Sequence, residues 1–353
     1  MNGVEGGSRA AVRAPVFIVG AWRSGTTLLR VTLNRHSQLA MWDGETAYFR
    51  RLYTRRRAFG APADPRNRER IVDAYLAIEP VRKTGLDLAV LRERLLAEGV
   101  SWRALFLSMI QAYAAFQGKP YAGEKTPSHA LHVETLCEWF PGCAIIHLVR
   151  DPRDAVSSLM TMPWSTRSAL MCARKWGLLN RAALAVSGRG NYLRVRYEDL
   201  AARPEEQLRR ICGHIGLEYE ESLLNANPAE RDSQPHNTRS YERITPARLA
   251  VWRTALKPWQ VAAVEAVAGR LMEEFGYERQ TKRAPLASMA RAVLEALVET
   301  TIQKFLRLPC IFTHVFQPTH LDDEQKRLMR ASAIYARLRL LPRRALDSPA
   351  SSE

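Results

Sequence analysis

Short apolar runs alternate along this chain with longer segments whose apolar residues recur at helical spacing. The run VFIV at residues 16–19 ends in a glycine-containing turn, and LLRVTLNRH follows it with apolar positions three and four residues apart. This order predicts a buried strand, a loop and a helix. Further strands are expected just before Glu124, at residues 144–149 and at residues 192–195.

Helices are expected between and after these strands, at residues 152–160, 167–186 and 258–275. Pro152 favours the first position of its helix, because a proline there removes no hydrogen bond that the helix needs. The segment YEDL at residues 197–200 is expected to be a polar turn that closes the last strand. Strands that alternate with helices predict an α/β fold with a central parallel sheet flanked by helices.

The rest of the chain falls into three further regions. Residues 46–118 are helical in pattern and predict a helical insertion beside the sheet, with its first helix at 46–58. Residues 1–14 are small, polar and glycine-rich, as in a flexible tail. We therefore expect one domain at residues 15–280, followed at residues 281–353 by an arginine-rich helical extension with a disordered end.

Charge points to an anionic ligand but does not choose its class. The net charge is +16 and the pI is about 10.0, which favours nucleic acid, a membrane surface or a small polyanion. One arginine cluster permits peripheral contact with a membrane or an acidic acceptor, and a solvated helix face is its alternative. The cluster comprises Arg50, Arg51, Arg55, Arg56 and Arg57.

Cysteine usage and hydropathy predict a cytoplasmic protein. The five cysteines are widely spread and include no C-x-x-C pair, which argues against a disulfide framework and a zinc site. The N-terminus lacks the apolar run of a signal peptide, and no segment reaches the roughly 18 apolar residues of a membrane span.

The segment GAWRSGTT, which begins at Gly20, has the composition and context of an anion-binding loop. It lies between a predicted strand and a predicted helix, so its glycines allow successive amides to face an anion at the helix N-terminus. The spacing G-x-x-x-x-G matches the nucleotide-binding P-loop, but Thr26 stands where that loop has lysine. A cation is supplied within the loop by Arg23. A simple glycine turn is the alternative interpretation.

Two motifs in the same order resemble those of the sulfotransferases that use 3′-phosphoadenosine-5′-phosphosulfate (PAPS). PVFIVGAWRSGTTLLRVTLNRH is similar to their 5′-phosphosulfate loop, and IHLVRDPRDAVSSL is similar to their 3′-phosphate motif. EKTPSH at residues 124–129 and RYEDL at residues 196–200 extend the resemblance, which covers about residues 15–280. It implies a single P-loop-type α/β domain, and the arrangement most resembles that of the tyrosylprotein-type and bacterial branch.

The resemblance implies a role for each matching residue. Arg150 and Ser158 correspond to the pair that holds the 3′-phosphate, and a bidentate arginine with a hydroxyl is also a good phosphate clamp on chemical grounds. An ion pair of Arg150 with Asp151 or Asp154 is the alternative. Arg23 and Lys125 correspond to cations that stabilise the leaving 5′-phosphate. The other expected donor-binding residues are Ser24, Gly25, Thr26, Thr27, Tyr197, Arg239 and Ser240, with Trp252 nearby.

Glu45 is the candidate general base, because a glutamate followed by threonine has that role in the tyrosylprotein-type branch. A structural alternative is an acid that stabilises the first turn of a helix, and His129 is the substitute base. His129 and His132 have no third residue at a metal-ligand spacing, so we expect no metal ion.

The implied reaction converts PAPS and an acceptor to a sulfated acceptor and adenosine 3′,5′-bisphosphate. Two rivals remain at this point, a kinase-like P-loop protein and a catalytically inactive basic binding protein on the same fold. Thr26 argues against the first, and the retained Arg23, Lys125, Arg150 and Ser158 argue against the second. No nucleic-acid partner is expected. The acceptor (small molecule, carbohydrate, lipid-linked or peptide) and the oligomeric state stay open.

Overall fold

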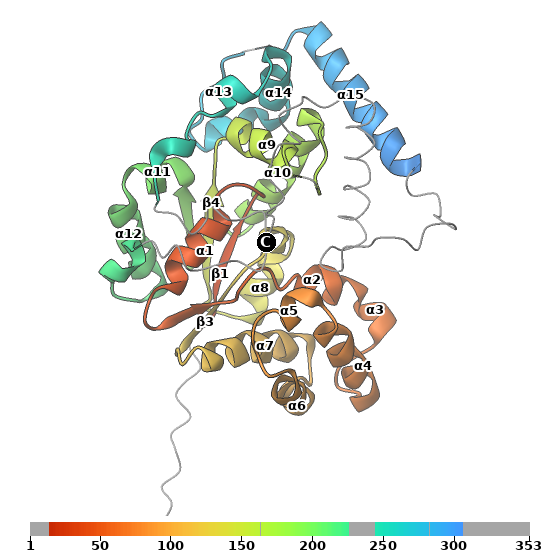
Figure 1. The fold of residues 1–353 in the computed structure, drawn as a ribbon, viewed down its shortest axis with the longest axis vertical. Helices are drawn as coiled ribbons and strands as arrows, with labels where there is room; N and C mark the ends of the chain where they lie inside the picture. Colours follow the sequence, from red (N-terminus) through yellow and green to blue (C-terminus); the bar gives the residue numbers. More distant parts are fainter. Residues whose placement is uncertain (1–13, 163, 226–243, 282, 306–353) are drawn as a thin grey trace, which may run out of the picture.

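A five-stranded parallel sheet forms the centre of the molecule (Figure 1). The computed structural model describes residues 14–162, 164–225, 244–281 and 283–305. The sheet order is β2-β3-β1-β4-β5, and every neighbouring pair is parallel. The strands are β1 (Val16–Gly20), β2 (Leu39–Met41), β3 (Tyr121–Lys125), β4 (Ala144–Val149) and β5 (Tyr192–Arg196). The predicted α/β fold with a central parallel sheet is therefore confirmed.

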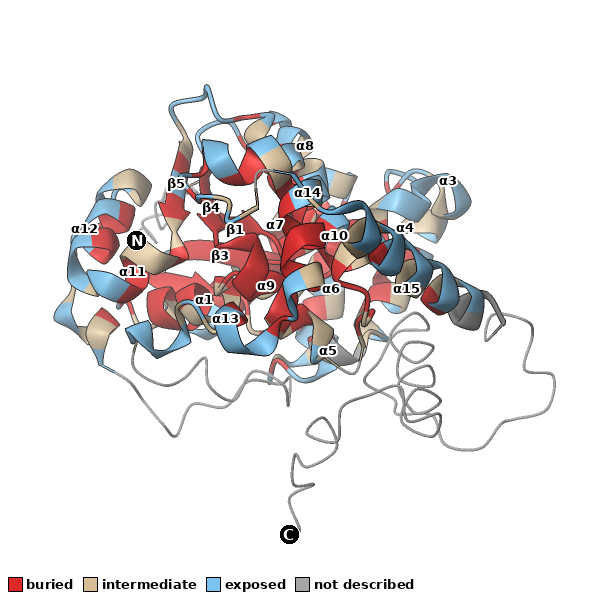
Figure 2. Ribbon diagram, turned by 90° about the horizontal axis from the view of Figure 1, so that it is seen from above, coloured by how far each residue is buried: buried red, intermediate tan, exposed pale blue. Residues whose placement is uncertain are grey.

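Helices cover both faces of this sheet because successive side chains of its strands, which point to opposite faces, are apolar. Phe17 and Val19 of β1 belong to one buried cluster, and Val16 and Ile18 belong to another. The first cluster includes residues of α7 (Trp102–Phe116), α8 (Val133–Trp139), α10 (Ala169–Leu184) and α14 (Pro258–Glu274). The second includes residues of α1 (Thr26–Asn34), α11 (Tyr197–Ala202) and α12 (Pro204–Ile215). Figure 2 shows the buried sheet between these two layers.

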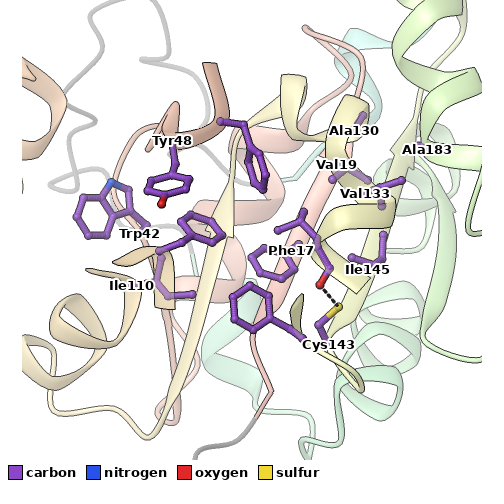
Figure 3. Close-up of a cluster of buried hydrophobic side chains, with 14 of the residues drawn as sticks. Phe17, Val19, Trp42, Tyr48, Ile110, Ala130, Val133, Cys143, Ile145 and Ala183 are labelled. Atoms are coloured by element: carbon purple, nitrogen blue, oxygen red, sulfur yellow. Dashed lines mark hydrogen bonds between the residues drawn. The ribbon is translucent and has the colours of Figure 1, made fainter. Parts of the chain in front are cut away.

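The helical insertion packs its aromatic residues against the first of these clusters. Figure 3 shows Phe17 of β1 with Tyr48 and Ile110 of the insertion in one apolar core. Besides α7, the insertion consists of α2 (Tyr48–Arg51), η1 (Tyr53–Arg55), α3 (Arg56–Phe59), α4 (Pro65–Leu76), α5 (Glu79–Arg82) and α6 (Leu88–Glu98).

Two local expectations were wrong, and one strand was not expected. The single helix expected at residues 46–58 is divided into α2, η1 and α3, because Phe49 turns inward against His132 and Trp139 and tertiary packing overrides helical propensity. The YEDL segment is the start of α11, whose first turn contains Glu198 and Asp199, and acids are favourable at a helix N-terminus. Strand β2 was not expected, since three residues are too short for a pattern.

The remaining elements lie around the sheet. They are η2 (Pro127–His132), α9 (Pro152–Met160), η3 (Glu221–Leu224), η5 (Pro246–Arg248), α13 (Trp252–Ala255) and α15 (Leu286–Phe305). Helix α15 packs on α10 and α14, and η3 lies against α1 and α12. Helix α9 has the predicted bounds, with Asp151 as its N-cap. Within the described residues, no helix combines the length and apolar character needed to cross a membrane. Residues 1–13 of the tail expected at 1–14, and the chain from 306 onward, lie outside the described residues.

Candidate active site

The carboxyl ends of three neighbouring strands bring the predicted site residues together. Strand β1 lies between β3 and β4, with Ile18 opposite Lys125 and Gly20 opposite Leu148. Lys125 therefore ends β3 beside the loop that follows β1, and Arg150 follows β4 on the other side. In open parallel sheets, ligands bind at this edge where the order of strands reverses.

The loop between β1 and α1 has the backbone of an anion-binding turn. Gly25 has a φ angle of 91° and caps α1, and a Cβ atom placed there would lie 2.5 Å from Cδ2 of Tyr197. Glycine alone fits this position without displacing the tyrosine ring. Thr26 and Thr27 form the first turn of α1, so the predicted loop leads directly into a helix N-terminus, where anions are favoured.

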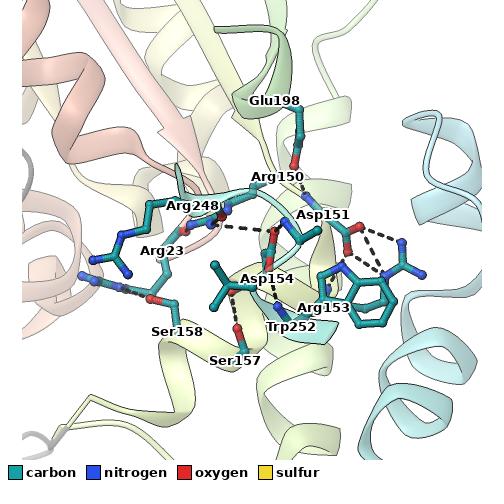
Figure 4. Close-up of polar contacts among 12 residues, drawn as sticks. Arg23, Arg150, Asp151, Arg153, Asp154, Ser157, Ser158, Glu198, Arg248 and Trp252 are labelled. Atoms are coloured by element: carbon teal, nitrogen blue, oxygen red, sulfur yellow. Dashed lines mark hydrogen bonds and ion pairs between the residues drawn. The ribbon is translucent and has the colours of Figure 1, made fainter. Parts of the chain in front are cut away.

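Arg23 connects this loop to α9. Its backbone is in the left-handed region with a φ angle of 66°, and its Nε atom donates a hydrogen bond of 3.0 Å to Oγ of Ser158 (Figure 4). Nη1 of Arg150 donates to the carbonyl oxygen of Arg23 at 3.1 Å. The structure thus brings Arg23, Arg150 and Ser158 into one hydrogen-bonded group, although these residues are up to 135 positions apart.

Arg150 is fixed by several elements at once. Its Nη2 atom donates to the carbonyl oxygen of Arg248 at 2.6 Å, and its Cζ atom lies 4.4 Å from the ring centroid of Tyr197. Asp154 is 3.9 Å away, at the outer limit of an ion pair. Sequence reasoning did not find Arg248, because a backbone carbonyl leaves no signal in a side-chain motif.

The electrostatics of this group favour a negatively charged ligand. Burial lowers the pKa of Arg23 to about 10, and the charge of Arg150 adds to the lowering. The hydroxyl of Ser24 and Nε of Arg150 are buried and have no hydrogen-bond partner within the part of the chain that the structure describes. Because buried polar groups are nearly always paired, these donors fit a bound anion such as a phosphate or phosphosulfate.

Glu45 and Lys125 form an ion pair on the β3 side of the loop. Nζ of Lys125 lies 3.0 Å from Oε1 of Glu45, and the two side chains are 1% and 23% exposed. The lysine is thus buried behind the carboxylate, and the carboxylate is open to solvent. A base that must meet an incoming acceptor needs this kind of access.

His129 lies deeper than Glu45 and faces another carboxylate. Its Nδ1 atom is 2.9 Å from Oε2 of Glu124 without the alignment of a hydrogen bond, and both side chains are 1% exposed. The ring packs edge-on against Phe49, at 4.9 Å between centroids. His132 stacks on Phe49, and burial lowers the pKa of His132 to about 4, with help from the charges of His129 and Arg56. In the described ranges, no three His, Cys, Asp or Glu residues form a metal-binding group.

The remaining predicted donor-binding residues have different outcomes. Tyr197 contacts Arg150, as described above. Trp252 stacks with Arg153, whose Cζ atom is 4.1 Å from the centroid of the Trp252 ring. The backbone amide of Trp252 donates to Asp154 at 2.8 Å. Trp252 therefore packs behind Arg150 and α9. Arg239 and Ser240 lie outside the described residues.

Comparison with known sequences identifies relatives over most of the chain. The sequence model of the sulfotransferase family matches residues 15–221. The omega-hydroxy-beta-dihydromenaquinone-9 sulfotransferase of Mycobacterium tuberculosis is 27% identical over 313 residues, with 76% of each protein covered. Carbohydrate sulfotransferase 2 of Homo sapiens is 35% identical over 109 residues, which cover 30% of this chain and 20% of that protein.

Solved structures show the same fold. The sulfotransferase domain of the Synechococcus PCC 7002 olefin synthase matches with a TM-score of 0.56 and 25% sequence identity, over 76% of this chain and 97% of that domain. The sulfotransferase domain from the curacin biosynthetic pathway matches with a TM-score of 0.52 and 20% identity, over 76% of this chain and 99% of that domain.

Proposed function

The chain belongs to the sulfotransferase family, and from that premise we propose that it transfers a sulfuryl group from PAPS to an acceptor hydroxyl or amine. The observation that carries the proposal is the hydrogen-bonded group of Arg23, Arg150 and Ser158 beside a P-loop that has threonine in place of lysine. These residues suit an anion that is bound without a metal ion.

The donor is proposed to lie along the carboxyl edge of the sheet. The amides of the loop and the first turn of α1 would hold the 5′-phosphosulfate, with Ser24, Gly25, Thr26 and Thr27 around it. Arg150 and Ser158 would hold the 3′-phosphate, and the ring of Tyr197 supports Arg150 from behind. Bound PAPS supplies the sulfuryl group that is transferred.

Glu45 is proposed to accept the proton of the acceptor as the new sulfur–oxygen or sulfur–nitrogen bond forms. At the same time the bond between sulfur and the 5′-phosphate oxygen breaks, and Lys125 and Arg23 stabilise the negative charge that develops on that oxygen. The products are the sulfated acceptor and adenosine 3′,5′-bisphosphate. Transfer of this loose, in-line kind depends on positioning and charge more than on covalent catalysis.

The relative from Mycobacterium tuberculosis is named for an omega-hydroxy acceptor, which favours a hydroxyl over an amine. We also propose a cytoplasmic location, because the four described cysteines are free thiols and suit a reducing compartment. Peripheral contact with an anionic membrane through the arginine cluster at 50–57 is proposed as well.

A direct experiment is to incubate the protein with labelled PAPS and an extract of its own cells and to identify the labelled product by mass spectrometry. Glu45→Gln should lower kcat at least about 10²-fold while the affinity for adenosine 3′,5′-bisphosphate is kept. The structure rules out the alternative of a first-turn acid, because α2 begins at Tyr48 with Ala47 as its N-cap. If Glu45 only stabilises the fold through its pair with Lys125, Glu45→Gln will lower the melting temperature and keep its activity. Glu134→Gln removes a first-turn acid of α8 and is the control for a purely structural loss, of about 0.3–1 kcal/mol.

Two results would contradict the proposed function, and each would favour a different rival. ATP binding that is tighter than PAPS binding would favour the kinase-like rival. Salt-dependent binding of nucleic acid without any PAPS turnover would favour an inactive basic binding protein.

A further inference from the structure

The turn that presents Glu45 has an unusual backbone. Gly44 and Ala47 have φ angles of 74° and 48°, so Glu45 and Thr46 lie between two residues in the left-handed region. Alanine adopts this conformation only where surrounding contacts hold it. The contacts that hold this turn therefore determine where the carboxylate of Glu45 points.

A buried carboxylate, Glu124, makes most of these contacts. Its Oε1 atom accepts hydrogen bonds from the amide of Thr46 at 3.3 Å and from the hydroxyl of Thr46 at 2.9 Å. Oε1 also accepts from the hydroxyl of Thr126, which in turn accepts from the amide of Ala47 at 3.4 Å. One oxygen atom of Glu124 thus organises both residues that follow Glu45.

The same residue is next to Lys125 in β3. Successive side chains of a strand point to opposite faces. The turn therefore contacts both faces at the end of β3: Glu45 pairs with Lys125, and Thr46 donates to Glu124. Displacement of the turn would break both pairs. The position of the catalytic ion pair therefore depends on Glu124.

His129 lies against the second carboxylate oxygen of Glu124 and favours the ionised form of this buried residue. Burial raises the pKa of Glu124, but the nearby imidazole of His129 and the hydrogen bonds from Thr126 and Thr46 outweigh burial and leave the pKa below its usual value. The geometry agrees, since Nδ1 of His129 is 2.9 Å from Oε2. That oxygen faces the histidine, and the other holds the turn.

We infer that Glu124 is a positioning residue that holds Glu45 and Lys125 in place for sulfuryl transfer, with His129 as its charge partner and not as the base. This inference rests on the proposed function. It assigns a task to a buried residue that touches neither substrate, and it predicts that this residue affects kcat without affecting donor binding.

The test compares kcat for PAPS turnover with the affinity for adenosine 3′,5′-bisphosphate, measured by calorimetry. Glu124→Ala should lower kcat about 10²-fold, as a displacement of about 1 Å at a reacting group does, and should change the affinity less than about threefold. Glu124→Gln keeps one oxygen acceptor for Thr46 and Thr126, so its kcat should fall between those of the alanine variant and the wild type.

Glu265→Gln is the matched control. Glu265 is also 1% exposed, pairs with Arg153 at 2.8 Å and accepts from two backbone amides. Glu265→Gln should lower the melting temperature and keep kcat within about twofold of the wild-type value, because Glu265 lies outside the proposed catalytic group. Thr46→Val removes one of the hydroxyl donors to Glu124, and its loss of kcat should not add to that of Glu124→Ala, because the two changes break the same contact.

A folded Glu124→Ala protein with wild-type kcat would overturn the inference. So would an equal loss of kcat and nucleotide affinity, which would mean general damage to the fold. If Glu124→Ala does not fold, Thr46→Val decides, since unchanged kcat there contradicts the positioning role and a selective loss supports it. A wild-type protein without PAPS turnover in any acceptor screen would overturn the proposed function and this role together.

Discussion

Replacement of Arg150 by alanine can distinguish two roles of this residue, the proposed contact with the 3′-phosphate and the support of the loop after β1. Arg150 donates to the carbonyl oxygens of Arg23 and Arg248, and it stacks on Tyr197. Its removal will therefore loosen the loop for every nucleotide, including AMP, which lacks a 3′-phosphate. The ratio of the two affinities cancels this shared loss and reports the 3′-phosphate contact alone.

The expected magnitude follows from one charged hydrogen-bonding contact. Such a contact contributes about 1.5–3 kcal/mol, so the preference for adenosine 3′,5′-bisphosphate over AMP should fall about 10- to 150-fold. The shared loss should appear separately, as weaker binding of AMP and a lower melting temperature. Calorimetric titration of both nucleotides into both proteins measures each part.

Arg196 offers a control with a similar aromatic contact at the end of the neighbouring strand. It ends β5, as Arg150 follows β4, and its Cζ atom lies 4.6 Å from the ring centroid of Tyr277. Arg196→Ala should lower the melting temperature and leave the ratio of affinities unchanged. If Arg150→Ala weakens both nucleotides by the same factor, the assignment of Arg150 to the 3′-phosphate is refuted.

Three further outcomes are expected. Turnover should persist in EDTA, because the proposed charge stabilisation comes from Arg23 and Lys125, and strict dependence on a divalent ion would restore the kinase-like rival. Gly25→Ala should lower stability by about 1–3 kcal/mol and abolish tight nucleotide binding in calorimetry, because its Cβ atom would meet Tyr197; wild-type binding would contradict the loop geometry. Burial and Glu299 raise the pKa of Glu295 to about 7, so its contribution to stability is present below about pH 4.5 and lost as the pH rises through 7. Melting curves of Glu295→Gln should lack this loss, and parallel pH profiles for both proteins would contradict it.

Four of the five strands and the motifs of the proposed donor side could be recognised in the sequence because their signals are local, whereas β2 is too short to give a pattern. The apolar run at 144–149 and the proline after Asp151 give the bounds of β4 and the start of α9. The loop glycines and the spacing from Arg150 to Ser158 lie within single motifs. Arg150 and Ser158 can be expected to lie beside Arg23 once the parallel order of the strands is known.

The acceptor side was less predictable because its contacts join distant segments. Glu124 lies beside Lys125 in a recognisable motif, but its partner Thr46 is 78 positions away and its burial is a property of the folded chain. The division of the segment after Glu45 into short helices has the same cause. Aromatic packing around Phe49 determines the backbone conformation of this segment. The spacing of apolar residues in the sequence does not predict this packing.

The position of β1 in the middle of the sheet places the two halves of the proposed site on opposite sides of this strand. Contacts proposed for the donor come from the β1 loop, β4, α9 and α11, whereas Glu45 and the helical insertion lie on the side of β3. Exposed positions of residues 46–118 can therefore change without touching the contacts proposed for the donor, whereas the buried aromatic residues of the insertion share a core with Phe17 of β1. A chimaera that carries the exposed residues of a relative's insertion on this core would show whether the β3 side of the site sets the choice of acceptor.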